Sequence, residues 1–108
     1  MTAPLPTPHD LARLALSAAS SHLRAAQTAA RRHAHALSRI PQVPPDAQGS
    51  DPRHRERSRA ILRAAQAGQA YVAAAALAEW WYWEALDTAR EVLELDTDLA
   101  KRDHAVLP

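Results

Sequence analysis

The chain has 108 residues, of which 26 are alanine and only two are glycine. It contains no cysteine, which excludes disulfides, thiolate metal sites and cysteine nucleophiles. Its formal net charge is +1, so the chain is not driven towards disorder by self-repulsion. An alanine excess with so little glycine is typical of long helices that pack around a thin core.

The first predicted helix follows a proline-rich segment, residues 1–7, which we expect to be a flexible tail. Thr7, Pro8 and Asp10 have the residue types of a capping box: a hydroxyl cap, a proline in the first turn and an acid three residues after the cap. No proline or glycine then occurs before Pro41, so we predict a helix over residues 8–40.

A connection and a second helix follow. Residues 41–52 hold four prolines and Gly49, a composition that predicts irregular structure. Asp51 and Pro52 then provide a cap and a first turn for a helix over residues 53–95 that continues through Gly68. Residues 96–108 form a short third helix or a tail, or they continue the second helix. We therefore predict a single all-α domain, a hairpin of two long antiparallel helices.

Apolar residues of the second helix fall into two stripes when they are placed at 100° steps. The first stripe consists of Ile61, Ala65, Val72, Ala76, Trp83, Leu86 and Leu93. The second stripe consists of Ala67, Ala70, Ala74, Leu77, Trp81, Ala85, Val92, Leu95 and Leu99. One antiparallel neighbour covers one stripe, and a large apolar surface that stays exposed usually marks an interface.

This pattern predicts that the hairpin associates into a four-helix-type bundle, as a homodimer, a larger homo-oligomer or a complex with a partner protein. The alternative is a monomeric three-helix bundle with a break near Gly68 or Asp96. Residues 80–83, Trp-Trp-Tyr-Trp, add large side chains that point about 100° apart and so cannot share one core. We expect the protein interface to consist of Leu77, Trp80, Trp81, Val92, Leu95 and Leu99, with Trp80 as a peripheral anchor.

Charge is polarised along the chain. Residues 24–63 contain nine arginines and three acids, a net charge of +6, whereas residues 79–103 contain eight acids and three bases, a net charge of −5. The basic end of the hairpin is expected to dock on the acidic end of another chain, to bind a polyanion such as nucleic acid, or only to be solvated. Arginine suits phosphate contact because its guanidinium binds in a bidentate manner. The candidate residues are Arg31, Arg32, Arg39, Arg53, Arg55, Arg57 and Arg59.

Motifs that would indicate catalysis do not occur. His33 and His35 point to different helix faces, and the chain has no HExxH, P-loop or GxSxG motif. We expect no enzymatic activity, cofactor, metal ion or small-molecule substrate, and no membrane span. The lack of cysteine is consistent with a reducing compartment, and we expect a cytoplasmic protein. The predicted function is a non-catalytic helical interaction, scaffold or accessory subunit; the alternative is a nucleic-acid-binding accessory protein.

Overall fold

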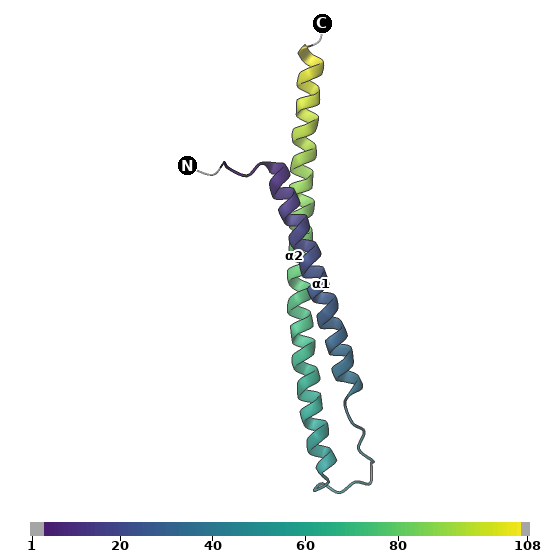
Figure 1. Cartoon of the computed structure of the whole chain (residues 1–108). Helices are drawn as coiled ribbons and strands as arrows, with labels where there is room; N and C mark the ends of the chain where they lie inside the picture. Colours follow the sequence, from purple (N-terminus) through teal and green to yellow (C-terminus); the bar gives the residue numbers. More distant parts are fainter. Residues whose placement is uncertain (1–3, 107–108) are drawn as a thin grey trace. The chain divides into compact units, whose positions relative to one another are not determined.

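The computed structural model describes residues 4–106, which form two helices, α1 (Pro8–Ser38) and α2 (Pro52–Val106), joined by an irregular connection (Figure 1). No strand occurs among these residues, so the predicted all-α class and helical hairpin are confirmed. Residues 4–7 of the predicted tail have no regular structure. Residues 1–3 of that tail, and residues 107 and 108 of the predicted C-terminal segment, lie outside the described part.

Helix α1 begins with the predicted capping box. The Thr7 N–H donates to Asp10 Oδ2 at 3.1 Å, and the Asp10 N–H donates to Thr7 Oγ1 at 3.1 Å. The helix ends at Ser38, two residues before the predicted boundary. Its last turn tightens because the N–H of Ile40 donates to Leu37 O. Pro41 explains the early end, since a proline disfavours helical backbone at the residue before it.

Helix α2 begins at the predicted cap, where the Arg53 N–H donates to Asp51 Oδ1 at 2.9 Å. The helix then continues through Gly68 and Asp96 without a break, so residues 96–106 continue α2 and form no separate third helix. Thr97 does not cap a new helix, because its hydroxyl donates to Leu93 O at 2.7 Å, within the preceding turn.

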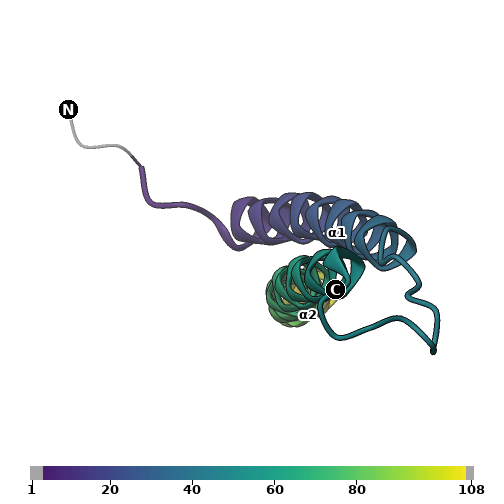
Figure 2. The ribbon, with the colours of Figure 1, turned by 90° about the horizontal axis from the view of Figure 1, so that it is seen from below.

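Two compact units make up the chain, and each contains part of both helices. Unit 1 comprises Met1–His22 and Leu77–Pro108, and unit 2 comprises Leu23–Ala76. The helices run antiparallel in each unit. In unit 1, His9 lies 3.5 Å from Asp96, and His22 stacks on Trp81 farther along α1. In unit 2, His33 stacks on Tyr71, and beyond it the connection closes the unit as a loop from the end of α1 to the start of α2 (Figure 2).

Only alanines are buried among the described side chains. Ala15 is buried in unit 1, and Ala26, Ala60 and Ala64 are buried in unit 2. A methyl group brings two helices close together, but its burial contributes only about 0.8 kcal/mol. The contact between α1 and α2 within each unit therefore stabilises the fold weakly for its length.

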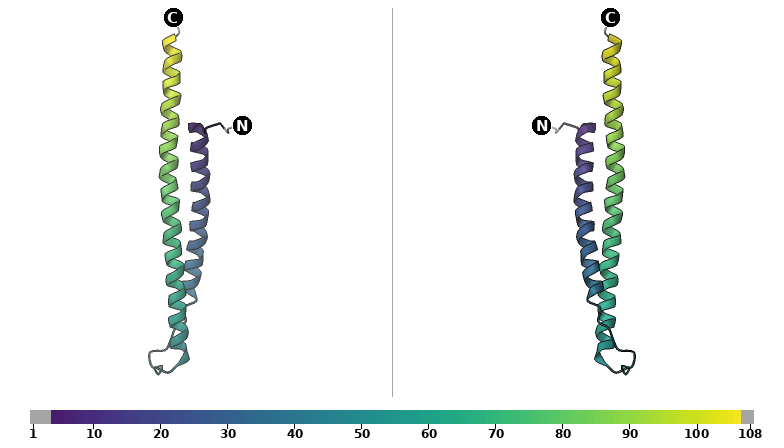
Figure 3. Two further views of the ribbon diagram at one scale, coloured as in Figure 1. Left: turned by 90° about the vertical axis from the view of Figure 1, so that its left-hand side faces the viewer. Right: turned by 90° about the vertical axis from the view of Figure 1, so that its right-hand side faces the viewer.

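The end of α2 has no partner from α1. In unit 1, α2 continues beyond the first turn of α1 after the contact between His9 and Asp96 (Figure 3). Every described side chain from Leu93 to Asp103 is exposed. Among the described residues, the part of α2 after Asp96 is held by hydrogen bonds within the helix and by no ion pair or side-chain hydrogen bond with α1.

Candidate interaction surface

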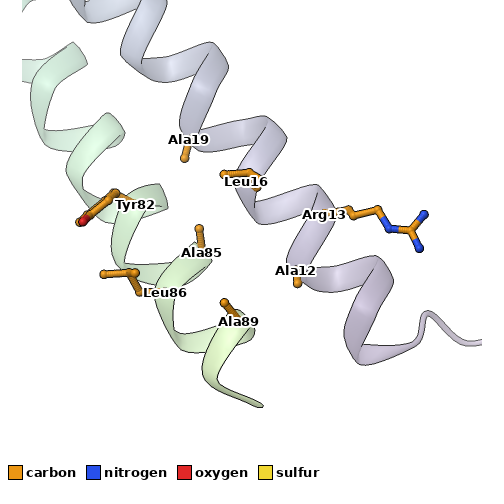
Figure 4. A pocket seen from close by; sticks show the side chains of 8 residues that line it. All are labelled: Ala12, Arg13, Leu16, Ala19, Tyr82, Ala85, Leu86 and Ala89. Atoms are coloured by element: carbon orange, nitrogen blue, oxygen red, sulfur yellow. The ribbon is translucent and has the colours of Figure 1, made fainter. Parts of the chain in front are cut away.

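An apolar groove lies between α1 and α2 in unit 1, with a volume of about 320 Å³ (Figure 4). Leu16 of α1 forms one wall, and Tyr82 and Leu86 of α2 form the other. The Arg13 side chain, at the margin, points away from the opposite helix (Figure 4). Alanines complete the lining, which makes this surface almost wholly apolar; we call it the alanine groove (Ala12, Leu16, Ala19, Tyr82, Ala85, Leu86 and Ala89).

Bulky side chains stand beside the alanine groove on α2. Tyr82 and Trp83 meet edge to face with ring centroids 5.8 Å apart, and Trp83 is 56% exposed. Leu86, one turn farther on, is also exposed. Because aromatic residues at a surface are common anchors of protein interfaces, this aromatic ridge (Tyr82, Trp83 and Leu86) is a candidate contact.

Small residues also line a surface of α2 in unit 2. They surround a shallow hollow of about 700 Å³, which His33, Gln69 and Tyr71 also line. At Gly68 a β-carbon would lie 3.1 Å from His33 Nε2, so the glycine permits the close approach of the imidazole ring. The spacing of three and four residues places the lining on one side of α2. We call this surface the small-residue hollow (Ala65, Gly68, Val72, Ala73 and Ala76).

The two stripes of α2 have different surroundings. Every member of the first stripe is exposed. In the second stripe, Trp81 is half-buried and stacks on His22, with centroids 6.1 Å apart and planes 6° apart, and Val92 is half-buried as well. The other predicted interface residues are exposed, namely Leu77, Trp80, Leu95 and Leu99. A role for these six residues in association stays a prediction.

Sequence reasoning did not identify the wall that α1 contributes to the groove. Both predicted stripes lie on the second helix, whereas Leu16 lies on the first, and only the fold brings Leu16 and Leu86 to one groove. The alternation of residue size within the first stripe was a usable signal. Both alanines of this stripe, Ala65 and Ala76, lie in unit 2, whereas its unit 1 members are all large.

The predicted basic residues are all exposed and all belong to unit 2. Arg53 forms an ion pair with Asp51 at 2.6 Å, and its side-chain and backbone hydrogen bonds lower the pKa of that carboxyl to about 2. Arg57 Nη1 donates to Pro41 O at 2.9 Å and so ties α2 to the connection. Of the seven predicted arginines, only Arg53 pairs with a carboxylate within the part of the chain that the structure describes.

Opposite charge distinguishes the two units. Unit 2 has nine arginines and three acids, a net charge of +6. Unit 1 has nine acids and four bases, a net charge of −5. Each unit therefore presents a field that attracts the other kind of unit on a separate molecule.

Within residues 4–106, no three histidine or carboxylate side chains gather where they could hold a metal ion. No helix in that range is long and apolar enough to cross a membrane. The chain matches no protein-family model, no curated protein and no solved structure.

Proposed function

We propose that this protein is a non-catalytic helical interaction protein, a scaffold or accessory subunit, that completes its core by association. The observation that carries the proposal is the composition of the core, in which alanine alone is buried among the described side chains. Most of the large apolar side chains among the described residues remain exposed. An apolar surface of this extent on a soluble chain marks an interaction site.

Surface area supports the same proposal. The chain exposes 8898 Å², whereas a compact monomer of 11.8 kDa exposes roughly 5900 Å². The difference of about 3000 Å² exceeds the roughly 800 Å² that each partner buries in a standard interface. One interface of ordinary size therefore fits within the excess.

The association surface that we favour is the first stripe of α2 together with the alanine groove. Trp81, at the middle of the second stripe, already stacks on His22 within the chain. The first stripe has no such partner, and in unit 1 it borders the alanine groove at Leu86. Two hairpins that meet through these surfaces would form a four-helix arrangement.

Leu86→Glu tests this surface. We expect the wild-type chain to have a mass above 11.8 kDa in light scattering at micromolar concentration, and Leu86→Glu to reduce it to the mass of one chain. A buried carboxylate without a partner costs several kcal/mol, which is enough to dissociate an ordinary interface. Leu77→Glu, in the exposed part of the second stripe, is the matched control and should leave the mass unchanged.

Other outcomes separate the alternatives. Dissociation by Leu77→Glu and not by Leu86→Glu would assign the interface to the second stripe. If the wild-type chain has the mass of one chain and does not unfold cooperatively, its core is incomplete and its partner is a protein of different sequence. A single chain that is well folded and unfolds cooperatively at every concentration would overturn the proposed function.

Nucleic-acid binding is the second candidate function. The exposed arginines of unit 2 favour it, because apart from Arg53 the predicted set forms no ion pair within the described residues. Phosphate contacts give a steep salt dependence, with a slope of about −0.9 per phosphate on duplex DNA. A gel shift at 150 mM salt tests this function, and Arg55→Glu/Arg59→Glu should abolish any shift that these residues cause.

A further inference from the structure

We propose that the partner is a second copy of this chain, packed antiparallel so that the aromatic ridge of each copy enters the small-residue hollow of the other. This inference rests on the proposed function and identifies the partner and its orientation. Three observations lead to it: the shapes of the two surfaces, their spacing along α2 and the opposite charges of the two units.

Shape is the first observation. Trp83 and Leu86 are both exposed in unit 1, and Trp83 packs only edge to face against its neighbour Tyr82 among the ring contacts of the described residues. The hollow in unit 2 is open to solvent. Gly68, Val72 and three alanines line it, together with the larger side chains of His33, Gln69 and Tyr71. Bulky side chains that fill a recess of small ones give the close packing found in protein interiors. Each chain therefore has both halves of one complementary contact.

Spacing is the second observation. When two helices pack antiparallel, the residue numbers of the two members of each facing pair add up to the same value. If Gly68 of one copy faces Leu86 of the other, then Val72 faces Tyr82, beside Trp83, and Ile61 faces Leu93. All of these residues are exposed or half-buried and lie on the side of α2 that carries the first stripe. This register pairs a small or medium residue with a large one where Gly68 faces Leu86 and where Val72 faces Tyr82. It also pairs Ile61 with Leu93, two apolar residues of equal size, and sets Trp83 against Tyr71, which also lines the hollow.

Charge is the third observation, and it selects the orientation. Antiparallel packing sets unit 2 of one copy, with a net charge of +6, beside unit 1 of the other, with a net charge of −5. Parallel packing would set like charges together over both units. Complementary potentials favour the encounter of two chains, and like charges facing each other disfavour it.

Symmetry follows from the same contacts. Each copy contributes one ridge and one hollow, so the two contacts are equivalent and are related by a twofold axis. Such an interface is self-complementary and closes after two copies. We therefore infer a homodimer with no free ridge left for a third chain.

Cysteine cross-linking tests the orientation, because the natural chain has no cysteine that would compete. A mixture of Ile61→Cys and Leu93→Cys should give a disulfide-linked two-chain species under mild oxidation, since facing residues lie within the roughly 4.4–6.8 Å between Cα atoms that a disulfide needs. A mixture of Leu62→Cys and Leu93→Cys is the matched control. Leu62 is exposed too, but it points about 100° away from Ile61 and should not cross-link.

Two results of this experiment would overturn the inference. Efficient self-linking of Ile61→Cys alone would indicate parallel chains. A wild-type dimer whose Ile61→Cys and Leu93→Cys variants do not link would have another register or another surface.

An exchange of side-chain size tests the shape argument. Val72→Tyr fills the hollow and Tyr82→Val reduces the ridge at the residue that faces it, so each variant alone should weaken the dimer at least tenfold. Their mixture should recover a heterodimer close to wild-type strength, because one contact is native and the other has its two sizes exchanged. Circular dichroism of each variant confirms that the helices persist. If the mixture does not regain the dimer affinity, while Leu86→Glu still reduces the mass to that of one chain, the packing of ridge into hollow between two copies is wrong. The proposed function would then still stand.

Discussion

The carboxyl group of Asp51, which caps the start of α2, makes the stability of the protein depend on pH. Hydrogen bonds from the Arg53 side chain, and then from its backbone N–H, lower the pKa of Asp51 from its usual 3.8 to about 2. Because the folded state favours the charged carboxylate, this contribution to stability is complete above about pH 4. It is lost as the pH falls towards about 2.

We therefore expect Asp51→Asn to lower the thermal midpoint at pH 6 and to have little effect near pH 2. Asparagine still accepts a hydrogen bond as a helix cap, so the difference reports the charge and not the cap. The measurement is the thermal midpoint of both proteins across this pH range. Asp46→Asn, at an exposed acid of the same connection, is the control. Its thermal midpoint should not differ from that of the wild type at pH 6 in the way expected for Asp51→Asn.

Gly68 provides a second prediction at the scale of the residue. Replacement of a helical glycine by alanine stabilises a helix by about 1 kcal/mol, but here the new methyl would lie 3.1 Å from His33 Nε2. We expect Gly68→Ala to raise the free energy of unfolding by clearly less than about 1 kcal/mol in the wild-type chain. In a His33→Ala background the same substitution should raise it by the full amount of about 1 kcal/mol. Urea unfolding of the four chains of this double-mutant cycle measures the difference. Equal gains in both backgrounds would show that the imidazole moves aside without cost.

At the scale of the element, the C-terminal part of α2 depends on its own hydrogen bonds after Asp96. A short helical end without side-chain packing opens readily, because little apolar surface is lost when it unfolds. In the dissociated Leu86→Glu chain we expect backbone amides of residues 99–106 to exchange nearly as fast as in an unfolded chain. Amides near the buried Ala60 and Ala64 should be protected, and equal protection at both places would contradict this prediction.

The starts of the helices could be predicted from the sequence, and one of their ends could not. Thr7 with Asp10, and Asp51 before Pro52, are local signals whose hydrogen bonds need no tertiary contact. The segment from Asp96 to Asp98 permits either a cap or a continuing helix. Its outcome depends on the bond from Thr97 to Leu93 O and on the contact between Asp96 and His9, which lies far away in the sequence.

At the scale of the whole molecule, periodicity showed that α2 has two apolar stripes but could not show which one α1 would contact. The two stripes have similar apolar content, so hydrophobicity alone does not choose between them. The contact involves paired rings, such as His22 with Trp81, whose side chains fit only in the folded arrangement. The alanine groove was also unpredictable, because Leu16 and Leu86 come to line one groove only through the fold.

Salt should weaken the proposed dimer. Raising sodium chloride from about 0.1 M to about 1 M shortens the screening length from about 10 Å to about 3 Å, which removes attraction between units of opposite charge. We expect the dissociation constant to rise roughly tenfold, as measured by sedimentation equilibrium. An association that strengthens with salt would indicate that like charges face each other, as in a parallel dimer.

Alanine at the contact between α1 and α2 has a consequence for how firmly the helices hold their alignment. A row of identical methyl groups looks almost the same after a shift of one helical turn, about 5.4 Å, so it resists sliding poorly. The flat rings of His22 on Trp81 in unit 1, and of His33 on Tyr71 in unit 2, are not repeated one turn away. These two stacks therefore fix the axial alignment of α1 and α2 within each unit. Without them, the two helices could slide along each other while both stayed fully helical.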